Sequence, residues 1–143
     1  MSIQDAILIV EEAIKCKGVD PSTIRIPPAE GVGWILPADR TALFINLSDH
    51  DGLAIMRITS PILFMPPEDL LPFYRRILEL NAQAPGISLG MERDVVCVYA
   101  QQVLDGITSS TVNMLMDATF KALEILPEMI IYEFQSTRFW TPK

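Results

Sequence analysis

The 143-residue sequence is poor in the residues on which several classes of function depend. Its two cysteines, Cys16 and Cys97, lie far apart and in no CxxC spacing, so they predict neither a disulfide framework nor a zinc site. Thiols that stay reduced are typical of a cytoplasmic protein. The one histidine, His50, has no nucleophile at a recognisable spacing. No catalytic, cofactor-binding or metal-binding residues are therefore predicted.

Basic residues are also scarce, because 11 Lys and Arg stand against 18 Asp and Glu, which gives a net charge of −7. Nucleic-acid binding depends on Lys and Arg that neutralise phosphates, and anionic membranes attract the same side chains. No apolar run approaches the roughly 18 residues that a membrane span requires. The sequence therefore predicts neither a nucleic acid nor a membrane as partner.

Apolar residues, in contrast, make up half of the chain, enough for one core in a single domain over residues 1–143. Helical spacing of these residues predicts helices over 2–17, from Asp69 to the Pro85-Gly86 pair, and from about Thr108 to Pro127. Alternation and turn residues predict strands over 34–36, 41–47, 53–62, 87–91 and 95–100, with 20–33 as a linker and Ser48–Gly52 as a turn.

The predicted order is therefore helix, three strands, helix, two strands, helix. Strands joined by short turns favour an antiparallel sheet, and the fold class is α+β with five strands and three helices. Prolines are expected to interrupt this pattern: Pro37 to stop the first strand, Pro61 to fray the third, and Pro127 to kink or end the last helix. Residues 131–143 are a possible C-terminal extension with an aromatic tail.

Three features of this order resemble the type III secretion chaperone-like fold, and in particular its YbjN-like branch. The first is a Trp-containing strand followed by Thr41-Ala-Leu-Phe-Ile-Asn-Leu47. The second is a strand that ends in Ser60-Pro-Ile62 before the second helix. The third is Phe73-Tyr-Arg-Arg-Ile-Leu-Glu-Leu-Asn81, then Gly86-Ile-Ser-Leu-Gly90 and a strand of valines. The likeness spans about residues 3–126.

The resemblance implies a small acidic protein, often a dimer, with a twisted five-stranded antiparallel sheet. Members similar to secretion chaperones hold an extended segment of an effector without hydrolysing ATP, and YbjN-like members are relatives outside secretion systems. The proline at 127 and the aromatic tail through Trp140 depart from the simple chaperone pattern.

The residues themselves point to protein contacts, because several predicted strands are apolar on both faces and three helices can cover only one. A homodimer is the economical cover, with a covering tail and linker of the same chain as the alternative. The self-association residues expected on the second helix are Leu71, Phe73, Tyr74 and Leu78, and the residues expected to contact a second, unknown protein are Phe44, Met56 and Met114. The predicted function is a non-enzymatic, protein-binding homodimer, a chaperone-like or regulatory adaptor.

Two other functions stay open. One is a small-molecule-binding or enzymatic domain with a pocket between sheet and helices and His50 at its mouth. The other is a structural subunit of a larger assembly. Asp49-His50-Asp51-Gly52 has the residue types of a metal site but lacks the later ligands of a calcium loop, so a hairpin turn is the preferred interpretation. Asn81 is expected to bond to backbone groups at the helix end or in the next hairpin.

Overall fold

The computed structural model describes residues 2–26, 31–38 and 40–139. Its helices are α1 (Ile3–Cys16), α2 (Leu70–Gln83) and α3 (Ser109–Phe134), with a short 3₁₀ turn at Pro21–Thr23. Its strands are β1 (Arg25–Ile26), β2 (Val32–Ala38), β3 (Thr41–His50), β4 (Leu53–Phe64), β5 (Ser88–Glu92) and β6 (Val95–Val103). Within this part of the chain the fold is α+β with three α-helices, as predicted. No helix described here is both long and apolar enough to cross a membrane.

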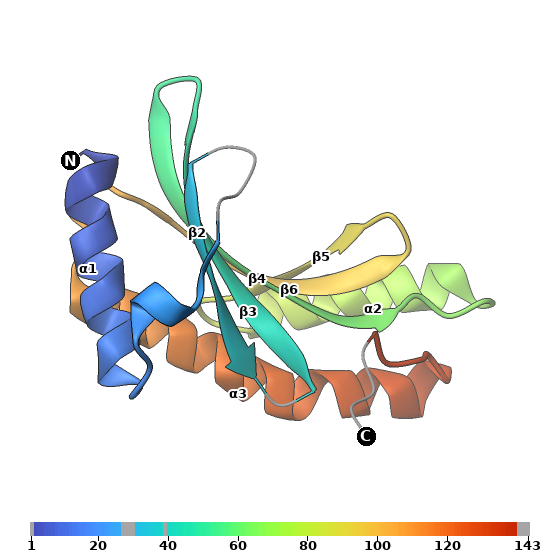
Figure 1. The fold of residues 1–143 in the computed structure, drawn as a ribbon. Helices are drawn as coiled ribbons and strands as arrows, with labels where there is room; N and C mark the ends of the chain where they lie inside the picture. Colours follow the sequence, from blue (N-terminus) through green and yellow to red (C-terminus); the bar gives the residue numbers. More distant parts are fainter. Residues whose placement is uncertain (1, 27–30, 39, 140–143) are drawn as a thin grey trace.

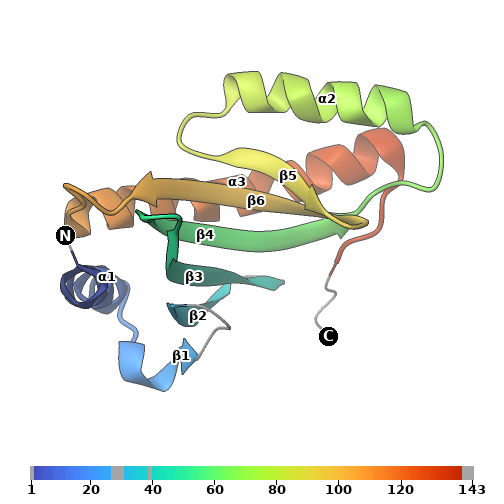
Figure 2. The same cartoon turned by 90° about the horizontal axis from the view of Figure 1, so that it is seen from above.

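The strands form one antiparallel sheet in the order β1-β2-β3-β4-β6-β5. α2 separates β4 from β5 in the chain, and β6 pairs with β4, which leaves β5 as an edge strand. Figure 1 shows α3 running beneath the sheet, with α1 at one end and α2 towards the other. Figure 2 shows α2 beyond β5, at that end of the strand order.

All three helices pack on one face of the sheet. Buried residues of α1 and the first half of α3 form one core cluster with alternate residues of β2, β3 and β4, among them Trp34, Ile45 and Ile58. Buried residues of α2 and the second half of α3 form another with β5 and β6, around Phe73 and Val98. The opposite face, which we call the open face, carries no helix of the described residues.

The prediction of five strands is wrong by one, because β1 lies inside the segment predicted to be a linker. Two residues are too few for alternation to reveal a strand in sequence. This strand forms because the 3₁₀ turn directs the chain back along β2, where the Ile35 N–H donates to the Ile24 carbonyl at 2.9 Å. A tertiary contact therefore creates the sixth strand.

The three prolines interrupt less than expected. β2 continues past Pro37, since β1 pairs only with Gly33 and Trp34 and leaves the edge of β2 open there. β4 continues past Pro61 to Phe64 because a bulge between Pro61 and Leu63 absorbs the irregularity. For Pro127, packing of the last turns of α3 outweighs the local preference.

α3 continues for seven residues beyond Pro127, so of the two outcomes expected at this proline, a kink or an end, the end does not occur. Proline inside a helix costs roughly 3 kcal/mol. Burial of Leu126 and Ile130 on both sides of the proline offsets this cost, since both belong to the core shared with α2.

The tail after α3 lies beside β4. The Phe64 N–H donates to the Thr137 carbonyl at 2.8 Å, and the Phe139 N–H donates to the Ile62 carbonyl at 3.1 Å. The predicted C-terminal extension thus begins within α3 and continues as an added segment of the sheet layer. Trp140, which the sequence analysis placed in the same tail, lies outside the described residues.

Candidate protein-interaction surfaces

The outward side of α2 is the first candidate surface. Leu71 and Leu78 are 81% and 69% exposed, and Tyr74, between them on the helix, is 40% exposed. We call these three residues the α2 stripe. Their positions i, i+3 and i+7 place them on one side of the helix, which is the arrangement that packs against another helix.

Phe73 was predicted to belong to the same surface, and this is wrong because its side chain is 0% exposed. Its ring meets Phe134 of α3 edge-on, with centroids 5.4 Å apart. Phe73, Ile77 and Leu80 form the side of α2 that faces the core. Phe73 therefore holds α2 on its own chain.

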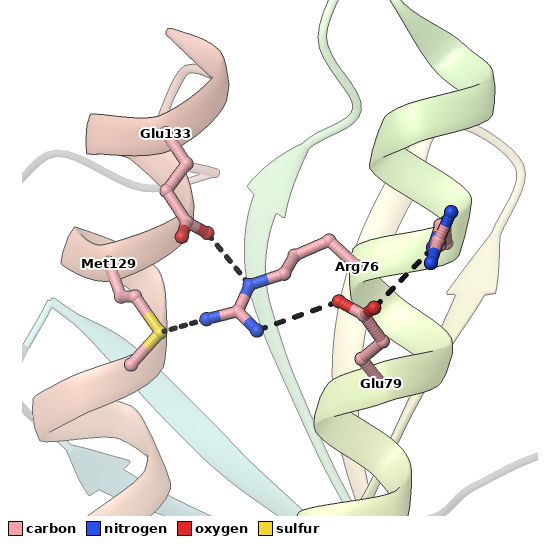
Figure 3. Close-up of polar contacts among 5 residues, drawn as sticks. Arg76, Glu79, Met129 and Glu133 are labelled. Atoms are coloured by element: carbon pink, nitrogen blue, oxygen red, sulfur yellow. Dashed lines mark hydrogen bonds and ion pairs between the residues drawn. The ribbon is translucent and has the colours of Figure 1, made fainter.

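Arg76 attaches α2 to α3 from the flank of the core-facing side that lies away from the α2 stripe. Its Nε donates to Glu133 Oε1 at 3.0 Å, and its Nη2 contacts the Met129 sulfur at 3.5 Å (Figure 3). Glu79, on the same helix, is 3.8 Å from Nη1. Glu79 also forms an ion pair with Arg75, one turn earlier on the helix, at 3.5 Å. The contacts to α3 escaped sequence analysis because Glu133 is 57 residues away in the chain.

The open face of the sheet is the second candidate surface. One row of register partners crosses it from β2 to β5: Ile35, Phe44, Thr59, Tyr99 and Ser88. Phe44 is 38% exposed, and the Arg57 guanidinium lies 5.9 Å from the centre of the Tyr99 ring. The face is thus a mixture of aromatic and polar side chains, and not uniformly apolar as the alternation of the strands suggested.

A hollow of about 560 Å³ opens on this face between Phe44 and the tail residue Phe139. Its other lining residues are Thr59, Pro61, Glu92, Arg93, Val95 and Cys97. Phe139 was missed as part of this surface because only the tail's pairing with β4 brings it there.

Cys97 is 3% exposed, and burial raises the pKa of its thiol, which keeps the sulfur protonated and unreactive at neutral pH. Burial likewise raises the pKa of its neighbour Tyr99, whose hydroxyl donates to Glu92 at 3.3 Å. Both groups are neutral here and suit contact with another surface better than proton transfer.

The two methionines predicted to contact a partner differ in position. Met56 is 0% exposed and lies opposite Leu47 on the helix-covered face, so its predicted role is wrong. Met114 is 66% exposed on α3. For Met114, and for Phe44 on the open face, contact with a partner stays a prediction.

His50 lies exposed at the end of β3, next to a two-residue turn at Asp51 and Gly52, both with positive φ. Its Nε2 is 3.1 Å from the Ser48 hydroxyl, and it lines neither the hollow near Phe44 nor a second hollow of about 370 Å³ between the ends of α2 and α3. Across residues 2–26, 31–38 and 40–139, no group of three or more His, Cys, Asp or Glu side chains is placed to hold a metal ion.

Asn81 makes the contact that the sequence suggested for it. Its side-chain oxygen accepts from the Leu89 N–H at 2.6 Å, and its side-chain nitrogen donates to the Leu89 carbonyl at 3.1 Å. The end of α2 is thereby joined to the first half of the next hairpin.

With this geometry in place, comparison with solved structures identifies the fold. A chain of the ExsC–ExsE complex matches with a TM-score of 0.67 at 10% identity, covering 90% of this chain and 95% of the other. A chain of the HopA1–SchA chaperone–effector complex matches with a TM-score of 0.61 at 17% identity, covering 90% and 97%. YbjN from E. coli matches with a TM-score of 0.54 at 13% identity, covering 93% and 99%.

The chain therefore has the fold of the type III secretion chaperones and of YbjN, which confirms the resemblance stated above. No protein-family model matches the sequence, and comparison with curated proteins finds no significant match. At these identities the likeness establishes the fold, and function has to be argued from the surfaces of this chain.

Proposed function

We propose that this protein is a non-enzymatic, protein-binding homodimer that acts in the cytoplasm as a chaperone-like or regulatory adaptor. The observation that carries the proposal is the pair of surfaces that the fold leaves uncovered: the α2 stripe and the open face of the sheet. Structures of the same fold come from a chaperone–effector complex and from the ExsC–ExsE complex, which supports protein binding as the use of such surfaces.

The α2 stripe is suited to self-association because it is self-complementary. Leu71 and Leu78 are equally distant from the midpoint between Tyr74 and Arg75. In an antiparallel, two-fold pairing of two α2 helices, Leu71 of each copy meets Leu78 of the other. The same pairing places Arg75, which is 83% exposed along its side chain, beside the partner's Tyr74, where a cation–π contact adds to the apolar burial.

Leu71→Asp and Leu78→Asp are each expected to convert the dimer into a folded monomer. Each change places a carboxylate against a leucine of the second copy, and neither disturbs the core, because both side chains are largely exposed. Multi-angle light scattering at micromolar concentration measures the change, with Leu8→Asp as the control, since Leu8 is 69% exposed on α1. A wild-type protein that is already a folded monomer at that concentration contradicts the dimer.

The open face is suited to a second protein, whose side chain enters the hollow between Phe44 and Phe139. Phe44→Asp is expected to reduce capture of that protein at least tenfold, because it replaces an aromatic wall of the hollow with a charge. Met114→Asp tests the separate contribution of α3. Capture from extracts of the native host, quantified by mass spectrometry, measures both, and the folded Leu8→Asp protein is again the control.

The outcomes of this experiment separate the proposed adaptor from the other functions. Loss of one specific protein with Phe44→Asp supports an adaptor. Retention of the same proteins by all variants contradicts the open face as the binding surface and favours a structural subunit held through other contacts.

A further inference from the structure

The free edge of β5 is closed by a side chain. β5 is the last strand of the sheet, so one of its sides has no strand of the described residues beside it. Such an edge presents unpaired N–H and C=O groups that can pair with a strand of another chain. On β5, however, both backbone groups of Leu89 bond to the Asn81 side chain, at 2.6 and 3.1 Å.

The direction of these bonds identifies the side of the strand that Asn81 occupies. In an antiparallel pair, the backbone groups of alternate residues point towards the neighbouring strand and those between them point away. Because the N–H and C=O of Leu89 are both taken by Asn81, they point away from β6. The primary amide supplies one acceptor and one donor side by side, which are the two groups that an added strand would offer.

We propose that Asn81 prevents the β5 strands of two copies of this chain from pairing edge to edge. Without the amide, Leu89 is self-complementary: two copies related by a two-fold axis at Leu89 exchange both of its hydrogen bonds. The second copy is the expected occupant because this edge is complementary to itself, so that an identical strand satisfies both backbone groups of Leu89. Asn81 thus keeps two β5 edges from joining into one continuous sheet.

This inference goes beyond the proposed function. To keep the two tests separate, the Asn81 variants are made in the Leu78→Asp background, in which the α2 stripe no longer associates. In that background, Asn81→Ala frees both backbone groups of Leu89. Asn81→Asp keeps an acceptor for the N–H but places a second oxygen against the carbonyl. Gln83→Ala, an exposed change two residues further along α2, is the matched control.

Asn81→Ala is expected to speed amide hydrogen exchange of Leu89 at least tenfold at high dilution, whereas Asn81→Asp keeps the acceptor for this N–H, so that its effect is measured by association; both variants lose the bond to the Leu89 carbonyl. At tens of micromolar they are expected to form dimers in sedimentation velocity and to bind a fluorescent peptide that copies residues 86–93. The Gln83→Ala control stays monomeric and does not bind the peptide. Adding Met91→Pro to Asn81→Ala is expected to reverse the association, since Met91 presents its backbone on the same side of β5 as Leu89.

Folded Asn81 variants that remain monomeric and do not bind the peptide overturn the proposal. If Asn81→Ala does not fold, Asn81→Asp decides, because it retains one of the two bonds. The unmodified protein supplies a further test that depends on no variant: peptide binding by wild type as tight as that of the Asn81 variants also overturns the proposal.

Discussion

Met56→Asp is expected to abolish folding, although sequence analysis placed Met56 among the residues that contact a partner. Its side chain is 0% exposed and lies in the core under α1 and α3. Aspartate there loses the packing of a buried methionine, which costs about 2–5 kcal/mol on truncation. It also buries a carboxylate at a penalty of several kcal/mol more. The sum is comparable to the roughly 5–15 kcal/mol by which whole domains are stable.

Far-ultraviolet circular dichroism and the fluorescence of the buried Trp34 measure this loss. Two controls separate burial from the chemistry of the substitution. Met56→Leu keeps the volume and is expected to cost less than about 1.5 kcal/mol. Phe44→Asp introduces the same charge on the open face and is expected to leave a folded protein. A Met56→Asp protein that melts at the wild-type temperature contradicts the assignment of Met56 to the core.

Phe73→Ala is expected to lower the free energy of unfolding by about 3–5 kcal/mol, the range measured for Phe→Ala in cores. The change removes the edge contact with Phe134 and leaves a cavity between α2 and α3. Because Phe73, Ile77 and Leu80 are the buried residues of α2, we expect this helix to loosen first. Urea denaturation followed by circular dichroism measures the total effect, and hydrogen exchange over residues 70–83 localises it.

Leu71→Ala is the matched control for this prediction, since Leu71 is 81% exposed and two residues away on the same helix. We expect it to change the stability of the monomer by no more than about 0.5 kcal/mol. Equal effects of the two substitutions would contradict the orientation of α2. The measurement is made in the Leu78→Asp background, so that dimerisation does not add to the apparent stability.

The orientation of α2 gives three parts of this helix different roles. One side of the helix holds the core, the neighbouring side carries the α2 stripe, and its last turn closes the β5 edge through Asn81. Arg76 forms an ion pair with Glu133 of α3. Because this pair is partly exposed, it contributes at most about 1 kcal/mol to holding α2 on α3. The geometry of α2 thus determines which apolar groups other proteins can reach.

Sequence pattern alone determined the order of the main elements, the fold class and the resemblance to the chaperone-like fold. Periodicity of 3.6 for helices and 2 for strands is a local property, and so are the turn residues at Asp51-Gly52 and Pro85-Gly86. These signals depend only on neighbours in the chain, which is why α1, α2 and the two long hairpins were predicted within a few residues.

Tertiary structure alone decided which apolar residues are buried. Residues of a helix advance by 100° each, so Leu71 and Phe73 lie on different sides of α2. Both sides are apolar in sequence, and only packing against α3 selects the side of Phe73 for the core. Along β4 the alternation marks two faces, and only the position of the helices places Met56 on the covered one. The two-residue β1, the continuation of α3 past Pro127 and the contact of Phe139 with the open face likewise depend on residues far apart in sequence.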